Sequence, residues 1–181
     1  MEHLAWIGNP EALFNSKVST MVVQRALPDV VGFLIGKRGP QQAEQDLRDI
    51  SRIITQRMLL VWQPKSKKPY QIVKEMMGLF FGNKKVKGKV IERNPKDKRP
   101  TKIIIRDRDC PICPEKKGEE LEEVTEIHYC VAVAGFIEAV IRHLMDSDLV
   151  PYTNVVCKTV KSVGSGDKHC EHHIDLEYGG W

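Results

Sequence analysis

Residues 129 to 145 read YCVAVAGFIEAVIRHLM, and residues 150 to 178 read VPYTNVVCKTVKSVGSGDKHCEHHIDLEY. In the first stretch, apolar residues recur every three or four positions, which is the period of a helix with a buried face. In the second stretch, the turn residues Gly164 to Asp167 separate two runs that favour β-structure, as in a hairpin. The two stretches therefore predict a helix over 129–145 that packs on strands over 150–163 and 168–178.

A further hairpin is expected upstream of this unit. Residues 86–92 alternate lysine with apolar or small residues, 102–107 are rich in β-branched residues, and 94–100 are typical of a turn. Three helices are expected before the hairpin, over 16–36, 41–62 and 70–81. Since strands that adjoin in sequence usually pair antiparallel, the predicted class is α+β. It consists of N-terminal helices and a four-stranded antiparallel sheet of two hairpins joined by a helix.

The helix expected over 41–62 carries an apolar stripe at helical spacing, which we expect to face the core. Its members are Ala43, Leu47, Ile50, Ile54, Met58 and Val61. At 181 residues, with 41% hydrophobic and 29% charged residues, the chain is expected to form one globular domain. It has no apolar run of about 20 residues and no signal-peptide pattern, so a soluble cytoplasmic protein is expected.

Positive charge is concentrated between residues 65 and 108, which hold 15 Lys and Arg against four Asp and Glu. Such a block can attract phosphate, either in nucleic acid or on an anionic membrane surface. A solvated hairpin whose lysines guard its edges is the alternative. The block has no aromatic residue after Phe81 and no helix-turn-helix or zinc-finger spacing, so nucleic acid is the less favoured partner.

The five cysteines are the main candidates for chemistry: Cys110, Cys113, Cys130, Cys157 and Cys170. The C-x-x-C pair of Cys110 and Cys113 can direct two thiolates at one metal. We expect the turn near Gly164 to bring Cys157 opposite Cys170, with Cys130 close by through helix packing. Soft ligands gathered in this way suit tetrahedral zinc, with His172 as an alternative ligand. Buried structural thiols and redox chemistry are the other interpretations.

No catalytic motif is evident in the chain. There is no phosphate-binding GxxxxGK[ST], no HExxH and no nucleophilic triad with persuasive spacing. The segment Gly164-Ser165-Gly166 precedes a strand and not a helix, so it is not a dinucleotide fingerprint. A redox or metal enzyme that uses the C-x-x-C pair is the remaining enzymatic hypothesis, and a non-enzymatic protein is favoured.

Three spaced elements of the chain resemble the 4-vinyl-reductase domain, a small-molecule-binding module. The stretch CVAVAGFIE over 130–138 resembles its helix start, and Cys157 followed by GDKHCE over 166–171 resembles its hairpin. The stretch DCPIC over 109–113 resembles an element of archaeal members. The resemblance covers residues 84–178, and the family shares its fold with subunits of the TRAPP vesicle-tethering complex.

The resemblance implies a metal site, a ligand pocket and a dimer. In related sensory domains, zinc lies beside a buried pocket for an aromatic ligand, and its ligands map onto Cys130, Cys157 and Cys170. The fourth ligand there is a glutamate, but this chain has Asn154 at that position, so Cys110, Cys113 or His172 would substitute. The resemblance also implies a homodimer built on the helical part, residues 1–83.

Two functions follow as hypotheses. The first is a zinc-stabilised, non-enzymatic module that binds a small hydrophobic ligand between helix and sheet, beside Phe136, Val133 and Val140. These three residues could equally fill the core. The second is a TRAPP-like scaffold or tethering subunit that binds partner proteins or an anionic membrane surface, as a peripheral membrane protein.

Overall fold

The computed structural model describes residues 26–80, 82, 85–110, 112–113, 127–147 and 151–179. Residues 26–38 are helical, and the part of that predicted helix before residue 26 lies outside the described residues. The later elements are α2 (Pro40–Leu59), α3 (Pro69–Phe80), β1 (Lys87–Arg93), β2 (Pro100–Asp107), α4 (Val131–Asp146), β3 (Asn154–Lys161), the short helix η2 (Val163–Ser165) and β4 (Cys170–Glu177). The predicted α+β class is confirmed.

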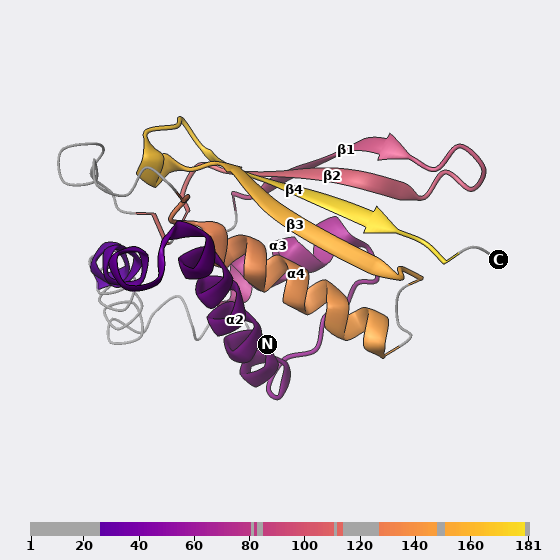
Figure 1. The fold of residues 1–181 in the computed structure, drawn as a ribbon. Helices are drawn as coiled ribbons and strands as arrows, with labels where there is room; N and C mark the ends of the chain where they lie inside the picture. The colour runs from indigo at the N-terminus through magenta and orange to yellow at the C-terminus, as the bar shows by residue number, and fades with distance from the viewer. Residues whose placement is uncertain are drawn as a thin grey trace, which may run out of the picture.

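The four strands form one antiparallel sheet in the order β1-β2-β4-β3. Each predicted hairpin pairs with itself, and β2 and β4 join the two hairpins at the centre of the sheet. In the chain, α4 connects β2 to β3, which are not neighbours in the sheet. The last strand, β4, lies between them. Figure 1 shows the labelled helices on one side of the sheet, so α4 is held between the sheet and α2.

The core forms where α4 meets the sheet. Residues 131–137 of α4 are all buried, because the helix contacts the strands on one side and α2 on the other. From the sheet, β2 contributes Ile103 and Ile105, and β4 contributes Ile174, each no more than 1% exposed. Alternate residues of these strands therefore face the helices, as the period of two in a half-buried strand requires.

The buried stripe of α2 differs from the predicted one. The buried residues are Ala43, Leu47, Ser51, Thr55 and Leu59, whereas Ile50, Ile54 and Val61 are exposed. The reason is the close approach of the two helices at Gly135. A Cβ added at Gly135 would lie 2.8 Å from the Ser51 Cβ and 3.2 Å from the Arg48 Cα, so only a small side chain fits there. The Ser51 and Thr55 hydroxyls are satisfied by the carbonyls of Leu47 and Ser51.

The outer edge of β3 is bound by side chains of α4. The Glu138 carboxylate accepts the Cys157 N–H at 3.0 Å, and the Arg142 guanidinium donates to the Val155 carbonyl at 2.8 Å. Arg142 also donates to Glu138, and Arg48 of α2 pairs with the same carboxylate at 3.6 Å. These contacts satisfy backbone groups of an edge strand and fix β3 against both helices.

The register of the second hairpin differs from the prediction. Cys157 lies opposite Ile174 and not opposite Cys170. The expected pairing was wrong because Cys157 lies seven residues before Gly164, whereas Cys170 lies only three residues after Asp167. A hairpin centred on Gly164–Asp167 places residue 174 opposite Cys157, as observed. The connection runs from Ser162 to His169 and includes η2, and a register shift lies between Thr159 and Lys161. Cys170 is therefore the first residue of β4, next to the connection.

Candidate metal centre

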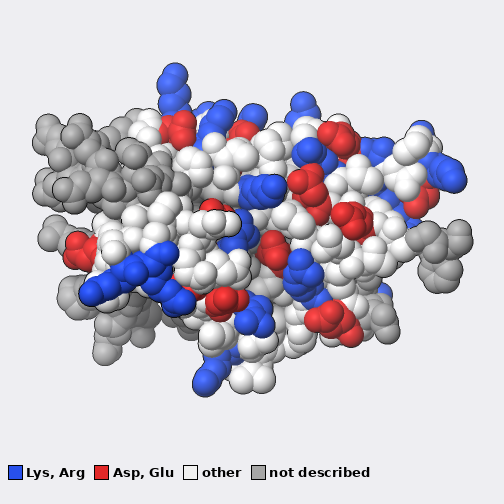
Figure 2. Space-filling view, viewed as in Figure 1, with Lys and Arg blue, Asp and Glu red and all other residues white. Residues whose placement is uncertain are grey.

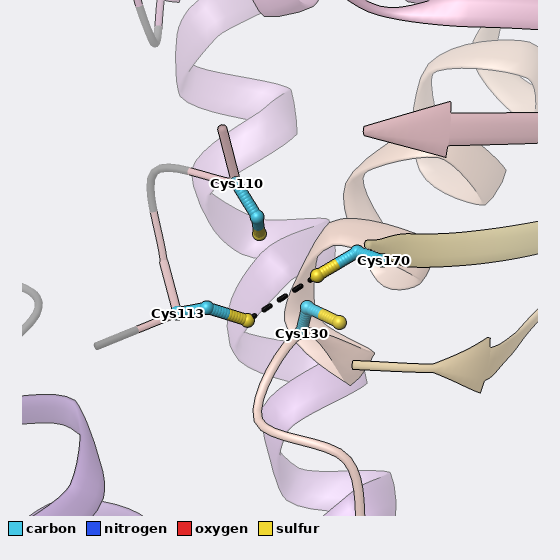
Figure 3. Close-up of side chains that lie close together, drawn as sticks. All are labelled: Cys110, Cys113, Cys130 and Cys170. Atoms are coloured by element: carbon cyan, nitrogen blue, oxygen red, sulfur yellow. Dashed lines mark hydrogen bonds between the residues drawn. The ribbon is translucent and has the colours of Figure 1, made fainter. Parts of the chain in front are cut away.

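Four cysteines from three parts of the fold converge on one point. Cys110 and Cys113 lie on the loop after β2, Cys130 immediately precedes α4, and Cys170 begins β4. Their Sγ atoms all lie within 4.8 Å of one another. Figure 3 shows the four side chains close together, with the sulfurs of Cys113 and Cys170 directed toward each other. All four are buried, with between 0% and 6% of their surface exposed.

The spacing of the sulfur atoms fits a single tetrahedral metal ion. With a Zn–S distance of about 2.3 Å, the edge of a ZnS4 tetrahedron is about 3.8 Å. The separation of Cys113 Sγ from Cys170 Sγ is 3.3 Å, and no pair in the group exceeds 4.8 Å. The four sulfurs therefore bracket the required edge, and a set of four thiolates is a common structural zinc site. The residues present fit zinc.

The β3–β4 connection supplies polar groups around the sulfurs. The Ser162 hydroxyl lies 3.4 Å from Cys113 Sγ, and the Val163 N–H donates to Cys170 Sγ at 3.3 Å. This connection is itself fixed by Asp167, whose carboxylate accepts the Ser162 N–H at 2.9 Å and whose N–H donates to the Ser162 carbonyl. Groups of this kind orient the ligands of a metal and tune its affinity.

Negative charge within the group is focused on Cys113. Hydrogen bonds from Cys110, Cys130 and Cys170 hold the pKa of the Cys113 thiol below its ordinary value, and Ser162 adds to the effect. The hydrogen bond to Cys113 conversely raises the pKa of Cys110. The lowered pKa favours a thiolate at Cys113. Because thiolates and not thiols are metal ligands, such a group is suited to bind a metal cation.

Cys157 lies outside this group. It is fully buried on β3, and its N–H is bound by Glu138 at 3.0 Å. Burial raises the pKa of the Cys157 thiol, and the neighbouring Glu138 carboxylate acts in the same direction. Asn154, the position where the resemblance places a glutamate ligand, also lies elsewhere, since its side chain accepts a hydrogen bond from Arg142 at 3.4 Å. The four convergent cysteines therefore leave both Cys157 and Asn154 out.

His172 lies next to the group but is not part of it. The Thr159 hydroxyl donates to the Cys130 carbonyl at 3.2 Å, so it accepts a hydrogen bond from His172 Nδ1–H at 3.1 Å. His172 Nε2 is buried and has no hydrogen-bond partner among the described residues. Burial lowers the pKa of His172 to about 4, so the ring is neutral at pH 7. The chain from His172 through Thr159 holds the backbone of Cys130 in place.

The residues proposed to bind a hydrophobic ligand are core residues of α4. Phe136, Val133 and Val140 are 6%, 1% and 0% exposed. An open hollow of about 660 Å³ lies elsewhere, at the start of α2, and none of these three residues lines it. Its lining residues are Arg38, Gly39, Pro40, Gln41, Gln42 and Gln45. Ligand binding beside α4 stays a prediction.

The basic block is partly neutralised by acidic residues. Lys102 pairs with Glu92 and with Asp175 of β4, and Arg106 pairs with Glu171 of β4 at 2.6 Å. Although burial favours the neutral form of Glu171, hydrogen bonds from His173 and Arg106 hold its pKa at about 2. Figure 2 shows basic and acidic side chains interspersed over the visible face. The strands thus carry a mixed surface, and contact with an anionic membrane stays a prediction.

The sequence did not single out Ser162 and Val163 as part of the site. The backbone N–H of Val163 has no signature in the sequence. Ser162, however, precedes Cys170 by eight positions and lies beside turn residues, and a serine in such a loop can bond a nearby thiolate. The C-x-x-C pair and the positions of Cys130 and Cys170 were the features that could be read from the sequence.

Comparison with known proteins supports the fold. No family model matches this chain, and no curated protein matches it. Among solved structures, it is similar to a trafficking protein particle complex subunit 3 from Naegleria fowleri, which was crystallised covalently bound to palmitic acid. The TM-score is 0.62 at 16% sequence identity, over 91% of this chain and 99% of that chain. The likeness shows a TRAPP-subunit-like fold, whereas the 4-vinyl-reductase resemblance stays a prediction.

None of the helices in the described part of the chain combines the length and the apolar composition needed to cross a membrane.

Proposed function

We propose that this chain is a non-enzymatic scaffold subunit of the TRAPP-like type, which assembles through α2 and whose fold is fastened by zinc. The observation that carries the proposal is the exposed apolar face of α2. Ile50, Ile53 and Ile54 are 44%, 52% and 43% exposed, whereas Ser51 and Thr55 on the same helix are 1% exposed. Burying a large aliphatic side chain contributes about 1.5–3 kcal/mol, so a protein that buries the small polar residues instead leaves a surface suited to a partner.

The occupant that best fits this face is a second copy of α2. When two α2 helices pack antiparallel about a twofold axis near Ile53 and Ile54, Arg57 of one copy lies next to the turn that holds Asp49 of the other. The pairing is self-complementary, as a twofold interface requires. It therefore joins an apolar centre to two opposite-charge contacts at its rim.

Zinc at the four-cysteine group has a structural role in this proposal. Zinc bound there would supply a cross-link between the loop after β2, the start of α4 and the start of β4. A metal held by four thiolates has no open position for a substrate, which supports a non-enzymatic protein. Because α4 packs directly on α2, the cross-link would also hold in place the helix on which the proposed α2 interface rests.

The native mass of the full chain tests the proposal. We expect a dimer by light scattering, and we expect Ile53→Glu to be a monomer with an unchanged far-ultraviolet circular dichroism spectrum. Ile91→Glu is the matched control, because Ile91 is 41% exposed on β1 and should leave the dimer intact. A monomeric wild-type protein, or a dimer that persists in Ile53→Glu, would contradict assembly through α2.

A second candidate function is the binding of an acyl chain or another small hydrophobic ligand. It is favoured by the palmitic acid bound to the similar solved structure, and the ligand would have to enter the core beside Val133, Phe136 and Val140, which are at most 6% exposed. The test is a melting curve with palmitate and with palmitoyl-coenzyme A, together with the intact mass. A raised melting temperature or a palmitoyl adduct would support it, and an unchanged curve and mass would count against it.

A further inference from the structure

Two of the four clustered sulfur atoms are nearly in position to bond. Cys113 Sγ and Cys170 Sγ lie 3.3 Å apart, although the residues come from different parts of the fold (Figure 3). This separation is shorter than the edge of about 3.8 Å in a ZnS4 tetrahedron. A disulfide needs an S–S bond of about 2.0 Å, so a movement of little more than 1 Å would join them.

The polar groups of the β3–β4 connection single out the same two sulfurs. The Ser162 hydroxyl lies 3.4 Å from Cys113 Sγ, and the Val163 N–H donates to Cys170 Sγ at 3.3 Å. Cys130 Sγ instead faces the Lys161 carbonyl at 3.8 Å, which is an acceptor. The connection therefore stabilises negative charge on Cys113 and Cys170 and holds the two side chains toward each other.

We infer that Cys113 and Cys170 form a disulfide when the protein meets a peroxide, and that this reaction releases the metal. The inference rests on the proposed zinc site. Exposure does not choose the first sulfur to react, because Cys110 is 6% and Cys113 3% exposed. Cys113 is assigned because the Ser162 hydroxyl lies 3.4 Å from its sulfur and Cys170 Sγ lies 3.3 Å away, ready to resolve it. Oxidation of the pair would remove two of the four thiolates that a tetrahedral ion requires.

The reaction balances with hydrogen peroxide as the oxidant. The Cys113 thiolate attacks the peroxide, so that an S–O bond forms, the O–O bond breaks and hydroxide leaves. The Cys170 thiolate then attacks the Cys113 sulfur, so that the S–S bond forms, the S–O bond breaks and a second hydroxide leaves. Each hydroxide takes up a proton to become water. The two thiolates lose two electrons in total, and the peroxide gains them.

The two states of the site differ at the start of α4. Zinc would link three parts of the fold: the loop after β2, Cys130 immediately before α4, and the start of β4. The disulfide would link only the loop after β2 to the start of β4. Oxidation would therefore free the first turn of α4 while it keeps a covalent link between Cys113 and Cys170. The loop after β2 and the start of β4 would stay linked in both states, so the cysteines would remain near one another. A thiol reductant could therefore restore the zinc-binding thiolates.

The inference is tested on the zinc-loaded full chain with stepwise addition of hydrogen peroxide. Zinc release is followed with a chromogenic chelator, and the cross-link is located by alkylation, proteolysis and mass spectrometry. We expect one zinc released per disulfide, a cross-linked peptide that contains Cys113 and Cys170, and recovery of zinc binding after reduction. Cys157→Ala, a variant outside the group, should respond in the same way.

Each failure has a different meaning. A cross-link between Cys110 and Cys113, or sulfinic acid without a cross-link, would overturn the assigned pair while the zinc site stands. Retention of zinc at peroxide concentrations that oxidise free cysteine would overturn the release step. A chain that binds no zinc before peroxide is added would overturn the metal site itself, and the release step with it. Loss of the α2 dimer in Ile53→Glu has no bearing on this result.

Discussion

Gly135 of α4 lies directly against Ser51 of α2, and the two helices approach closely at this contact. A methyl group at residue 135 would lie 2.8 Å from the Ser51 Cβ and 3.2 Å from the backbone of Arg48. The backbone of Arg48 cannot move aside without shifting the whole of α2. The contact sets the distance between the helix that follows Cys130 and the helix that carries the exposed isoleucines.

Gly135→Ala should therefore destabilise the protein, even though alanine has the higher helix propensity. Overpacking at a close helix contact costs about 1–3 kcal/mol, and urea unfolding would measure the loss. Gly36→Ala is the matched control, because Gly36 is helical and a Cβ there would meet nothing within 4 Å. It should leave stability unchanged or raise it by up to about 1 kcal/mol. Equal effects in the two variants would contradict the close contact.

Removal of single cysteines should separate the metal ligands from the remaining thiol. Cys170→Ser is expected to lose zinc and to melt at a lower temperature, because a buried ligand is removed. Cys157→Ala is expected to keep about one zinc per chain and to lose only about 1 kcal/mol of stability, since Cys157 is a buried thiol outside the group. Elemental analysis of the purified variants checks both. Zinc loss in Cys157→Ala would place Cys157 among the ligands.

Ser162 should affect zinc affinity without being a ligand. Ser162→Ala removes the hydroxyl that lies 3.4 Å from Cys113 Sγ, and zinc affinity is expected to fall about tenfold. Competition with a chromophoric chelator measures the change. Ser165→Ala is the control, because its hydroxyl lies on the same connection but contacts His128 at 3.4 Å. If the two variants bind zinc equally well, Ser162 has no role in tuning the site.

Charge reversal should test the geometry of the proposed α2 pairing. Arg57→Glu would set like charges against each other at both rims and is expected to weaken the dimer about tenfold. Asp49→Lys alone should weaken it similarly, and the combination of the two should restore much of the affinity. Sedimentation equilibrium provides the dissociation constants. Additive losses in the double variant would exclude contact between these two positions.

The order of elements could be predicted from the sequence because each element has its own period. The apolar residues of α4 recur at helical spacing, and Ile103 and Ile105 of β2 alternate with outward residues, so both elements were assigned correctly. The ends differ by a few residues. The strand expected from residue 150 begins at Asn154, and the helix expected to reach residue 62 ends at Leu59.

The face of α2 could not be predicted from hydrophobicity alone. Its isoleucines suggested an inward stripe through Ile50 and Ile54, yet the helix turns Ser51 and Thr55 inward. The choice is made by Gly135 on α4, which admits only a small side chain at this close contact. Such a constraint lies between two elements and has no signature in either one. As a result, the isoleucines of α2 lie on an apolar surface that the single chain leaves exposed.

The cysteine group could be predicted in part. Cys110, Cys113, Cys130 and Cys170 were expected near one site and they converge, whereas the expected pairing of Cys157 with Cys170 is wrong. That error arose because the two cysteines are not equally far from the turn. Cys157 lies seven residues before Gly164 and Cys170 three residues after Asp167, so Cys170 lies four positions away from Ile174, the residue opposite Cys157.

The central claim is that Cys110, Cys113, Cys130 and Cys170 hold one zinc ion. X-ray absorption at the zinc edge, on protein purified without added metal, tests it most directly. We predict about one zinc per chain with four sulfur neighbours at about 2.3 Å. Nitrogen or oxygen neighbours in place of one or more sulfurs, or protein that contains no zinc, would contradict it.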